Sequence, residues 1–68
     1  MRTNLKIWEI KNNFKSNWVA EQLEVTPSYY SQMKQGNKNP SMKLLKKFES
    51  VFGTTEGADN IYELFKNI

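Results

Sequence analysis

Apolar residues recur along this chain at intervals of three and four, the spacing that gathers side chains on one face of an α-helix. The first such segment, about residues 3–13, carries Leu5 and Trp8 on one stripe and Ile7 and Ile10 on another. No segment alternates apolar and polar residues in the manner of a β-strand. The pattern predicts an all-α fold that begins with this helix.

Two short helices are predicted next, joined by a tight link. Ser16 is placed to cap the first of them and Thr26 the second, with Pro27 at the first helical position, where a missing N–H is of no consequence. Gly36 is expected to end the second helix. The residues expected to face the core are Val19, Ala20, Leu23, Tyr30 and Met33.

The remaining residues predict two more helices. Ser41 opens the fourth and Gly53 stops it, and a fifth spans about residues 58–67. The apolar positions of the fourth are Leu44, Leu45, Phe48, Val51 and Phe52. Those of the fifth are Ile61, Leu64, Phe65 and Ile68. A chain of 68 residues buries only about 60% of the surface of its unfolded form, so we expect one compact domain over residues 1–68.

The two short helices and their link have the proportions of a helix-turn-helix, a unit that places its second helix in the major groove of DNA. The chain then continues through residues 39–45 with the sequence NPSMKLL. Over about residues 5–53 it resembles the phage repressor/Cro (XRE-type) helix-turn-helix family, in which a pattern "LA…GV…S…I…G…NPS…LL" spans the same distance. The resemblance implies a compact five-helix fold like that of lambda repressor, with the helix-turn-helix at about residues 16–36.

Two departures from the family pattern bear on the fold. Glu24 stands where the family usually has Gly, because the chain there adopts a left-handed conformation. A residue other than Gly in that conformation costs roughly 1 kcal/mol. The family also commonly pairs an Arg of its first helix with a Glu near the end of the recognition helix. Here the matching positions hold Glu9 and Lys34, and we expect a structural ion pair of reversed sense. The alternative is two separate solvated side chains.

The resemblance also implies which residues would touch DNA. The base contacts would be Ser28, Tyr29 and Gln32, while Pro27 offers only apolar contact. Gln32 is the best reader, because its amide can pair bidentately with adenine. No Arg lies on this surface, so specificity is expected to be modest or to depend on DNA shape. The expected phosphate contacts are Ser16, Asn17, Gln35, Asn37, Lys38 and Lys43.

Charge is distributed unevenly along the chain. The net charge is +3, but residues 1–48 hold nine basic and three acidic side chains, whereas residues 49–68 hold one Lys and four acids. A basic body with an acidic end is typical of a domain that turns one side toward phosphates. Lysines scattered for solubility are the plainer interpretation of the same numbers.

The composition excludes several kinds of site. The chain has no Cys and no His, which rules out disulfides, Cys/His zinc sites and the usual general base. Its carboxylates are spread thinly, and we expect no enzyme, no metal, no cofactor and no small-molecule ligand. Neither an apolar run long enough to span a bilayer nor a signal peptide can be recognised. The expected location is the cytoplasm of a bacterial host cell.

Two functions remain open. The first is a Cro-like regulator that binds double-stranded operator DNA as a homodimer, with Ile61, Phe65 and Ile68 at the contact between the copies. The second is an antirepressor, or modulator of repression, that grips a partner repressor protein with Trp18 and Tyr29 as anchors. Trp18 stands where the family usually has a polar residue. It either serves such an interface or folds over the edge of a thin core.

Overall fold

The computed structural model describes residues 1–67, and Ile68 lies outside the described residues. The described chain folds into α1 (Thr3–Lys11), α2 (Ser16–Gln22), α3 (Pro27–Gln35), α4 (Met42–Phe52) and α5 (Ile61–Leu64). No strand occurs in residues 1–67, so the all-α prediction is confirmed. None of these helices is long and apolar enough to cross a membrane.

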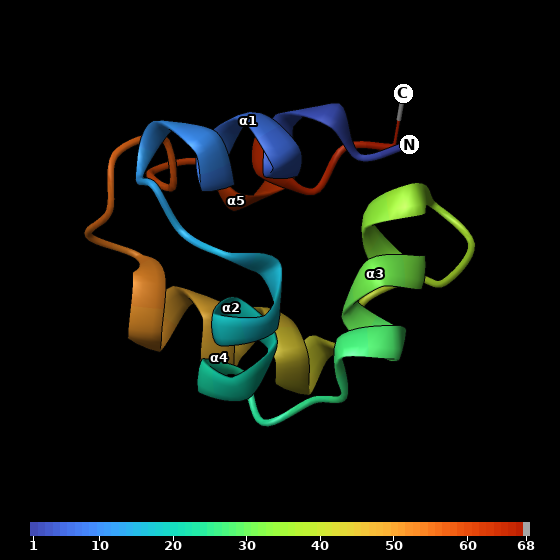
Figure 1. Ribbon diagram of the computed structural model, residues 1–68. Helices are drawn as coiled ribbons and strands as arrows, with labels where there is room; N and C mark the ends of the chain where they lie inside the picture. The colour runs from blue at the N-terminus through green and yellow to red at the C-terminus, as the bar shows by residue number, and fades with distance from the viewer. Residues whose placement is uncertain (68) are drawn as a thin grey trace.

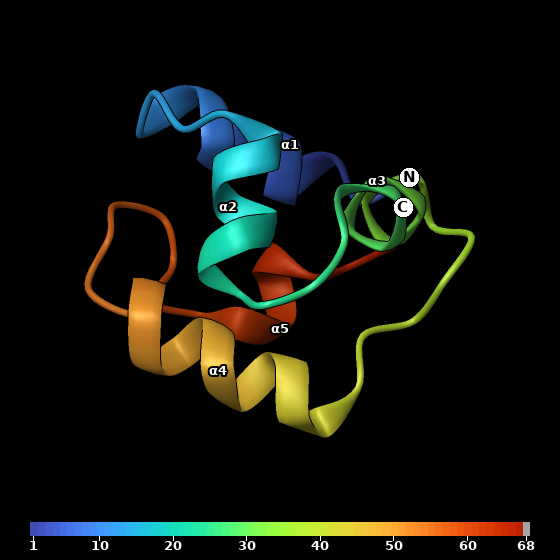
Figure 2. The same ribbon diagram turned by 60° about the horizontal axis from the view of Figure 1, so that its bottom comes forward.

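The helices are arranged so that α3 is supported from two sides. α3 contacts both α1 and α2, and α5 lies against α1 (Figure 1). In the view of Figure 2, α5 lies between α1 and α4. The two ends of the described chain meet beside the C-terminal end of α3, where the backbone nitrogen of Met1 donates to Asn67 Oδ1 at 2.9 Å.

An aromatic cluster forms the centre of the core. Trp8 of α1 is 1% exposed, and its ring centroid lies 4.9 Å from that of Phe48 and 5.1 Å from that of Phe52, both on α4. The indole N–H donates to Thr55 Oγ1 at 2.8 Å, which satisfies the one polar atom of the ring. The side chains predicted to face inward from α2 and α3 are all buried, namely Val19, Ala20, Leu23, Tyr30 and Met33.

Three helices end in the same way. One or two residues beyond the end of each helix the chain adopts a left-handed conformation, with φ of 57° at Asn13, 60° at Glu24 and 90° at Gly36. The next N–H then bonds back to the carbonyl five residues earlier, from Phe14 to Glu9, from Val25 to Ala20 and from Asn37 to Gln32. This Schellman pattern satisfies carbonyls that a helix end leaves unpaired. The left-handed turn expected at Glu24 is confirmed, and α1 stops at Lys11, slightly earlier than predicted.

The starts of α3 and α4 agree with the sequence prediction. Thr26 Oγ1 accepts a hydrogen bond from the Tyr29 N–H at 3.1 Å, and Pro27 is the first helical residue. Ser41 Oγ accepts from the Leu44 N–H at 3.1 Å. Each such cap contributes about 1 kcal/mol and fixes where its helix begins.

Ser16 does not cap α2, and the prediction that it would was wrong. Lys15 holds the N-cap position, and its side chain makes no capping bond. Ser16 is the first helical residue instead, and its hydroxyl is turned inward to the carboxylate of Glu9. A polar partner in the core has therefore outweighed the local capping preference.

The last helix is much shorter than predicted. α5 spans Ile61–Leu64 rather than residues 58–67. Its start is set by Asn60, whose Oδ1 accepts from two N–H groups of the first turn. Beyond its end the carbonyl of Phe65 accepts a hydrogen bond from Arg2 instead of continuing a helix. A local cap at its start and a tertiary contact beyond its end thus bracket the single turn of α5.

Substitution of Glu24 by Gly should stabilise the protein. Gly relieves the left-handed strain, and its greater freedom in the unfolded chain offsets part of the gain, so we expect about 0.5 kcal/mol of added unfolding free energy. Urea denaturation measures this. The control is Glu24→Gln, which removes only the charge of an exposed ion pair with Lys47 and should change the free energy less. A Gly variant no more stable than the Gln variant would contradict strain at this turn.

Candidate nucleic-acid interface

α3 presents two different faces. Its inner face carries Tyr30 and Met33, both 0% exposed. Its outer face carries Ser28 and Ser31, which are exposed, and Gln32, which is half-buried. The side chains of Ser28 and Gln32 make no hydrogen bond within residues 1–67. Their polar atoms are therefore available to another molecule.

Tyr29, which the sequence singled out both for base contact and for partner contact, is half-buried. Its hydroxyl donates to the carbonyl oxygen of Asn39 at 3.3 Å, so the side chain reaches the loop between α3 and α4. The hydroxyl proton is engaged there. What Tyr29 can offer outward is the uncovered part of its ring.

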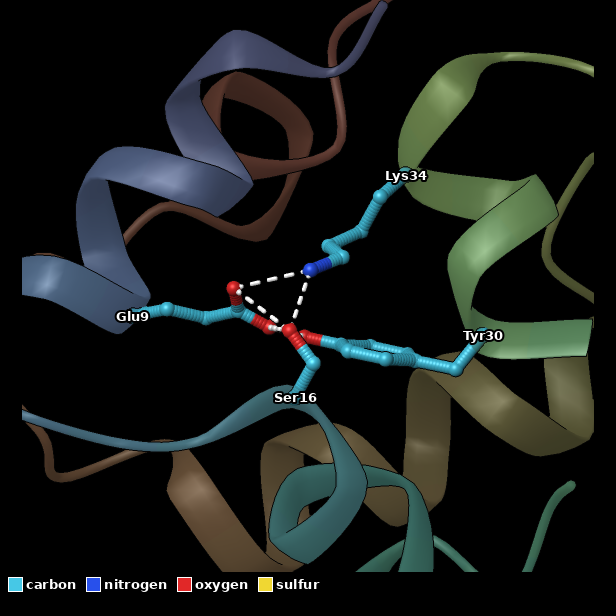
Figure 3. Close-up of polar contacts among 4 residues, drawn as sticks. All are labelled: Glu9, Ser16, Tyr30 and Lys34. Atoms are coloured by element: carbon cyan, nitrogen blue, oxygen red, sulfur yellow. Dashed lines mark hydrogen bonds and ion pairs between the residues drawn. The ribbon is translucent and has the colours of Figure 1, made fainter. Parts of the chain in front are cut away.

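Behind α3, side chains from three helices meet around one carboxylate (Figure 3). Glu9 of α1 is 5% exposed, and its Oε1 lies 2.9 Å from Lys34 Nζ. Its Oε2 accepts from the Tyr30 hydroxyl at 2.5 Å. The Ser16 hydroxyl, from α2, lies 3.2 Å from both carboxylate oxygens. The ion pair of reversed sense that the sequence predicted is present.

The ammonium group of Lys34 makes its hydrogen bonds within this cluster. Besides Glu9 it donates to the Ser16 hydroxyl, and it lies 5.1 Å from the centroid of the Tyr30 ring. The Lys34 side chain is only 17% exposed. Lys34 therefore holds α3 against α1 and is not placed to anchor a phosphate.

The residues expected at phosphates lie on three helices and on the loop between α3 and α4. Five of them are exposed, namely Asn17, Gln35, Asn37, Lys38 and Lys43. Gln35 and Asn37 are joined by a side-chain hydrogen bond of 3.4 Å, and Lys38 follows in the same loop. The structure thus brings these three together at the end of α3, while Asn17 lies on α2 and Lys43 on α4. The Ser16 hydroxyl is turned inward, which leaves only its backbone N–H for a phosphate.

Sequence reasoning missed Arg2, which is charged and yet 4% exposed. Its guanidinium donates to the carbonyl oxygens of Met33, Lys38 and Phe65 and to Asn39 Oδ1, at 2.6–3.0 Å. One side chain therefore joins α3, the loop after it and the segment after α5. The available signal was compositional. Arg2 is the one arginine of a chain that otherwise uses lysine, and Arg alone provides five N–H donors in a fixed fork.

A comparison with protein families matches residues 13–58 to a helix-turn-helix family. The matched span contains α2, the left-handed turn, α3 and α4, and it covers more than half of the chain. The chain belongs to the helix-turn-helix family. Its five-helix arrangement fits the lambda-repressor-like fold that the resemblance implied. The family comprises DNA-binding regulators that are typically not enzymes, so membership implies DNA binding. A search of the curated proteins and a search of the solved structures found no match.

Trp18 lies at the edge of the helix-turn-helix unit. Its side chain is 43% exposed, and its ring centroid lies 5.0 Å from that of Phe14 and 5.8 Å from that of Phe52. The expectation that Trp18 folds over the edge of the core is confirmed, and its role in a partner interface stays a prediction. The ring covers the edge of the core and still leaves nearly half of its surface to solvent.

The residues expected at a homodimer contact are placed differently from one another. Phe65 is 8% exposed, and its ring centroid lies 5.0 Å from that of Phe48, so it belongs to the core and not to a partner surface. Its expected role is corrected for that reason. Ile61 is half-buried, and Ile68 lies outside the described residues.

An open apolar groove of about 390 Å³ lies between α4 and α5. Its apolar lining includes Met42, Leu45, Ile61 and Tyr62. Met42 is 69% exposed and Tyr62 87%, although sequence reasoning singled out neither. Met42 lies outside the apolar period of α4, and the short α5 could not be foreseen, so no periodic signal marked these positions.

The Tyr30 hydroxyl is held in its protonated form. Burial raises the pKa of Tyr30 far above its usual value, and the hydrogen bond to Glu9 and the charge of that carboxylate raise it further. The folded protein therefore binds this proton more tightly than the unfolded chain does. The resulting stability is fully present below the unfolded pKa, about 10, and is lost as the pH rises above it.

Tyr30→Phe tests this coupling. At neutral pH the variant should be less stable by about 1–3 kcal/mol, because Glu9 loses a donor in the core. Above about pH 10 the difference should shrink by about 1.4 kcal/mol per pH unit, since only the wild type contains Tyr30, whose ionisation in the unfolded chain favours unfolding. Urea denaturation at a series of pH values measures both effects. Tyr62→Phe, at an exposed position, should keep the wild-type pH dependence. A gap between wild type and Tyr30→Phe that stays constant in alkali would refute the coupling.

Proposed function

We propose that this protein is a small Cro-like transcriptional regulator of a phage or mobile element, acting in the cytoplasm of its bacterial host. It binds operator DNA by placing α3 in the major groove. The observation that carries the proposal is the division of α3 into two faces. Tyr30 and Met33 fix the inner face, while Ser28 and Gln32 hold polar groups without a partner in residues 1–67. A fixed helix with unpaired outward polar groups is suited to read base edges.

Gln32 is the proposed reader of the operator. Its amide has both a donor and an acceptor, which match the N6 and N7 atoms of adenine in the major groove. Ser28 is short and contacts either kind of base, and the ring of Tyr29 can meet a thymine methyl. A single bidentate amide discriminates by about 1–3 kcal/mol at one base pair, so we expect modest sequence specificity.

The proposed phosphate contacts flank α3 on both sides. Before it, the backbone N–H groups of Ser16 and the adjacent Asn17 begin α2. After it come the exposed side chains of Gln35, Asn37, Lys38 and Lys43. Each phosphate that a lysine neutralises should steepen the log–log salt dependence of binding by about 0.9.

We also propose that two copies bind neighbouring half-sites as a homodimer, in contact through the groove between α4 and α5. Met42 and Tyr62 supply the exposed apolar surface, and Ile61 lies beside them in the groove. Such a small contact should be weak in solution. DNA would strengthen it, since half-sites about one helical turn apart hold the two copies close together.

Gln32→Ala should weaken binding to a duplex that the wild-type protein selects from a random pool by about 5- to 150-fold, the range that one bidentate base contact supplies. Binding to an unrelated duplex should not change, because phosphate contacts remain. Fluorescence anisotropy at fixed salt measures both affinities. Gln22→Ala, at a half-buried glutamine of α2, is the matched control and should bind as wild type. Equal losses on both duplexes would remove Gln32 as the reader.

A separate observation favours a second function. Ile7 and Ile10 of α1 are 46% and 71% exposed, and Trp18 is 43% exposed. Large apolar side chains left uncovered are common anchors of protein interfaces. We therefore propose, as the alternative, an antirepressor that binds a partner repressor protein through a surface that includes Trp18 and Tyr29.

Trp18→Ala separates the two functions. Under the alternative it should weaken binding of the repressor encoded beside this gene by about 30-fold or more, as expected for a hot-spot aromatic, and should leave DNA binding unchanged. Isothermal calorimetry with the purified repressor measures the loss. Tyr62→Ala removes an exposed aromatic side chain elsewhere on the molecule and is the control, and thermal unfolding confirms that both variants are folded. Binding of the repressor unaffected by Trp18→Ala would eliminate the antirepressor.

A further inference from the structure

The loop between α3 and α4, residues 36–41, carries part of the proposed phosphate surface without secondary structure of its own. Lys38 and Asn39 are exposed near its middle. A loop that must meet phosphates at fixed places has to be held by its surroundings, because an unrestrained loop loses entropy on binding.

Arg2 is itself fixed by three hydrogen bonds to groups outside this loop. Its backbone N–H donates to the Lys34 carbonyl at 2.7 Å. Its Nη1 donates to the Met33 carbonyl at 2.6 Å, and its Nε to the Phe65 carbonyl at 3.0 Å. The guanidinium is therefore held between the end of α3 and the segment that follows α5.

From this fixed position Arg2 reaches the loop twice. Nη1 also donates to the carbonyl of Lys38, and Nη2 donates to Asn39 Oδ1, both at 3.0 Å. The backbone of Lys38 is thus turned toward Arg2, while its side chain is left exposed. The planar fork of Arg makes this pair of bonds possible, and Lys cannot reproduce it.

The charge of Arg2 has no carboxylate partner within residues 1–67. Its acceptors are all neutral oxygens, of which the Met33 carbonyl lies at the negative end of the α3 dipole. Within residues 1–67 this positive charge is therefore met by neutral oxygens and by no carboxylate, and it lies one hydrogen bond away from the loop that is proposed to meet phosphates.

We propose that Arg2 is a positioning residue for DNA binding, which holds residues 38–39 so that the side chain of Lys38 meets a phosphate. This inference rests on the proposed DNA-binding function. Under this proposal, part of the DNA affinity that comes from the Lys38 contact depends on Arg2, a buried residue distant from α3 in sequence.

A double-mutant cycle between Arg2 and Lys38 tests the proposal. The affinity for a duplex from the DNA flanking this gene is measured by anisotropy across a salt series. In the wild-type background, Lys38→Gln should make the negative slope of log affinity against log salt less steep by about 0.9, the value for one phosphate contact. In the Arg2→Lys background, which keeps the charge and loses the fork, Lys38→Gln should have little further effect.

Lys43→Gln is the matched control, because Arg2 makes no hydrogen bond to Lys43. Lys43→Gln should make the slope less steep by about 0.9 in both backgrounds. An equal effect of Lys38→Gln in both backgrounds overturns the positioning role. The positioning role is also overturned if Lys38→Gln leaves the slope unchanged while Lys43→Gln makes it less steep. The proposed DNA-binding function would remain supported in that case, without a contribution from Arg2. A wild-type protein with no salt-dependent DNA binding overturns the proposed function itself.

Thermal unfolding shows first whether Arg2→Lys is folded. Should it unfold, the cycle is run with Asn39→Ala, which removes one of the two bonds to the loop at an exposed residue. This variant should reduce the slope change caused by Lys38→Gln. A full change of about 0.9 in the Asn39→Ala background overturns the proposal.

Discussion

The carboxylate of Glu9 is the group on which the position of α3 depends. Taking a carboxylate out of water costs several kcal/mol. Glu9 is only 5% exposed, so its carboxylate needs hydrogen-bond donors around it. Those donors come from Ser16, Tyr30 and Lys34, which lie on α2 and α3. The three helices must therefore meet in one arrangement. The same requirement explains why Ser16 turns inward and α2 begins without a side-chain cap.

Arg2 adds a constraint of opposite charge at the C-terminal end of α3, where it bonds the carbonyls of Met33 and Lys34. The helix is thus held from behind and from its end. Neither constraint uses Ser28 or Gln32 of the outer face. Residues there can change without loss of the contacts that fix α3, so the proposed operator preference can vary independently of the fold.

Local rules predicted much of this structure from the sequence. Thr26, Ser41 and Gly36 act through bonds to their own neighbours, so their effects can be recognised in the sequence alone. The turn at Glu24 and the pair of Glu9 with Lys34 followed from the family pattern rather than from propensity. What could not be predicted depends on distant partners. The Ser16 hydroxyl bonds to Glu9 instead of capping α2. Beyond α5, the Phe65 carbonyl accepts a hydrogen bond from Arg2, which is distant in sequence. The burial of Phe65 likewise depends on a residue distant in sequence, since its ring packs against that of Phe48 on α4.

The absence of arginine from the outer face of α3 shifts the expected source of affinity. With one amide suited to bidentate readout, the proposed base contacts would contribute a few kcal/mol at most, and the proposed phosphate contacts would have to supply the larger share. Affinity then depends on how accurately the phosphate contacts are placed. Lys38 lies in a loop without secondary structure, whereas Lys43 lies in a regular helix. The loop contact is therefore the one that needs external support, and the chain's single arginine is found where that support is required.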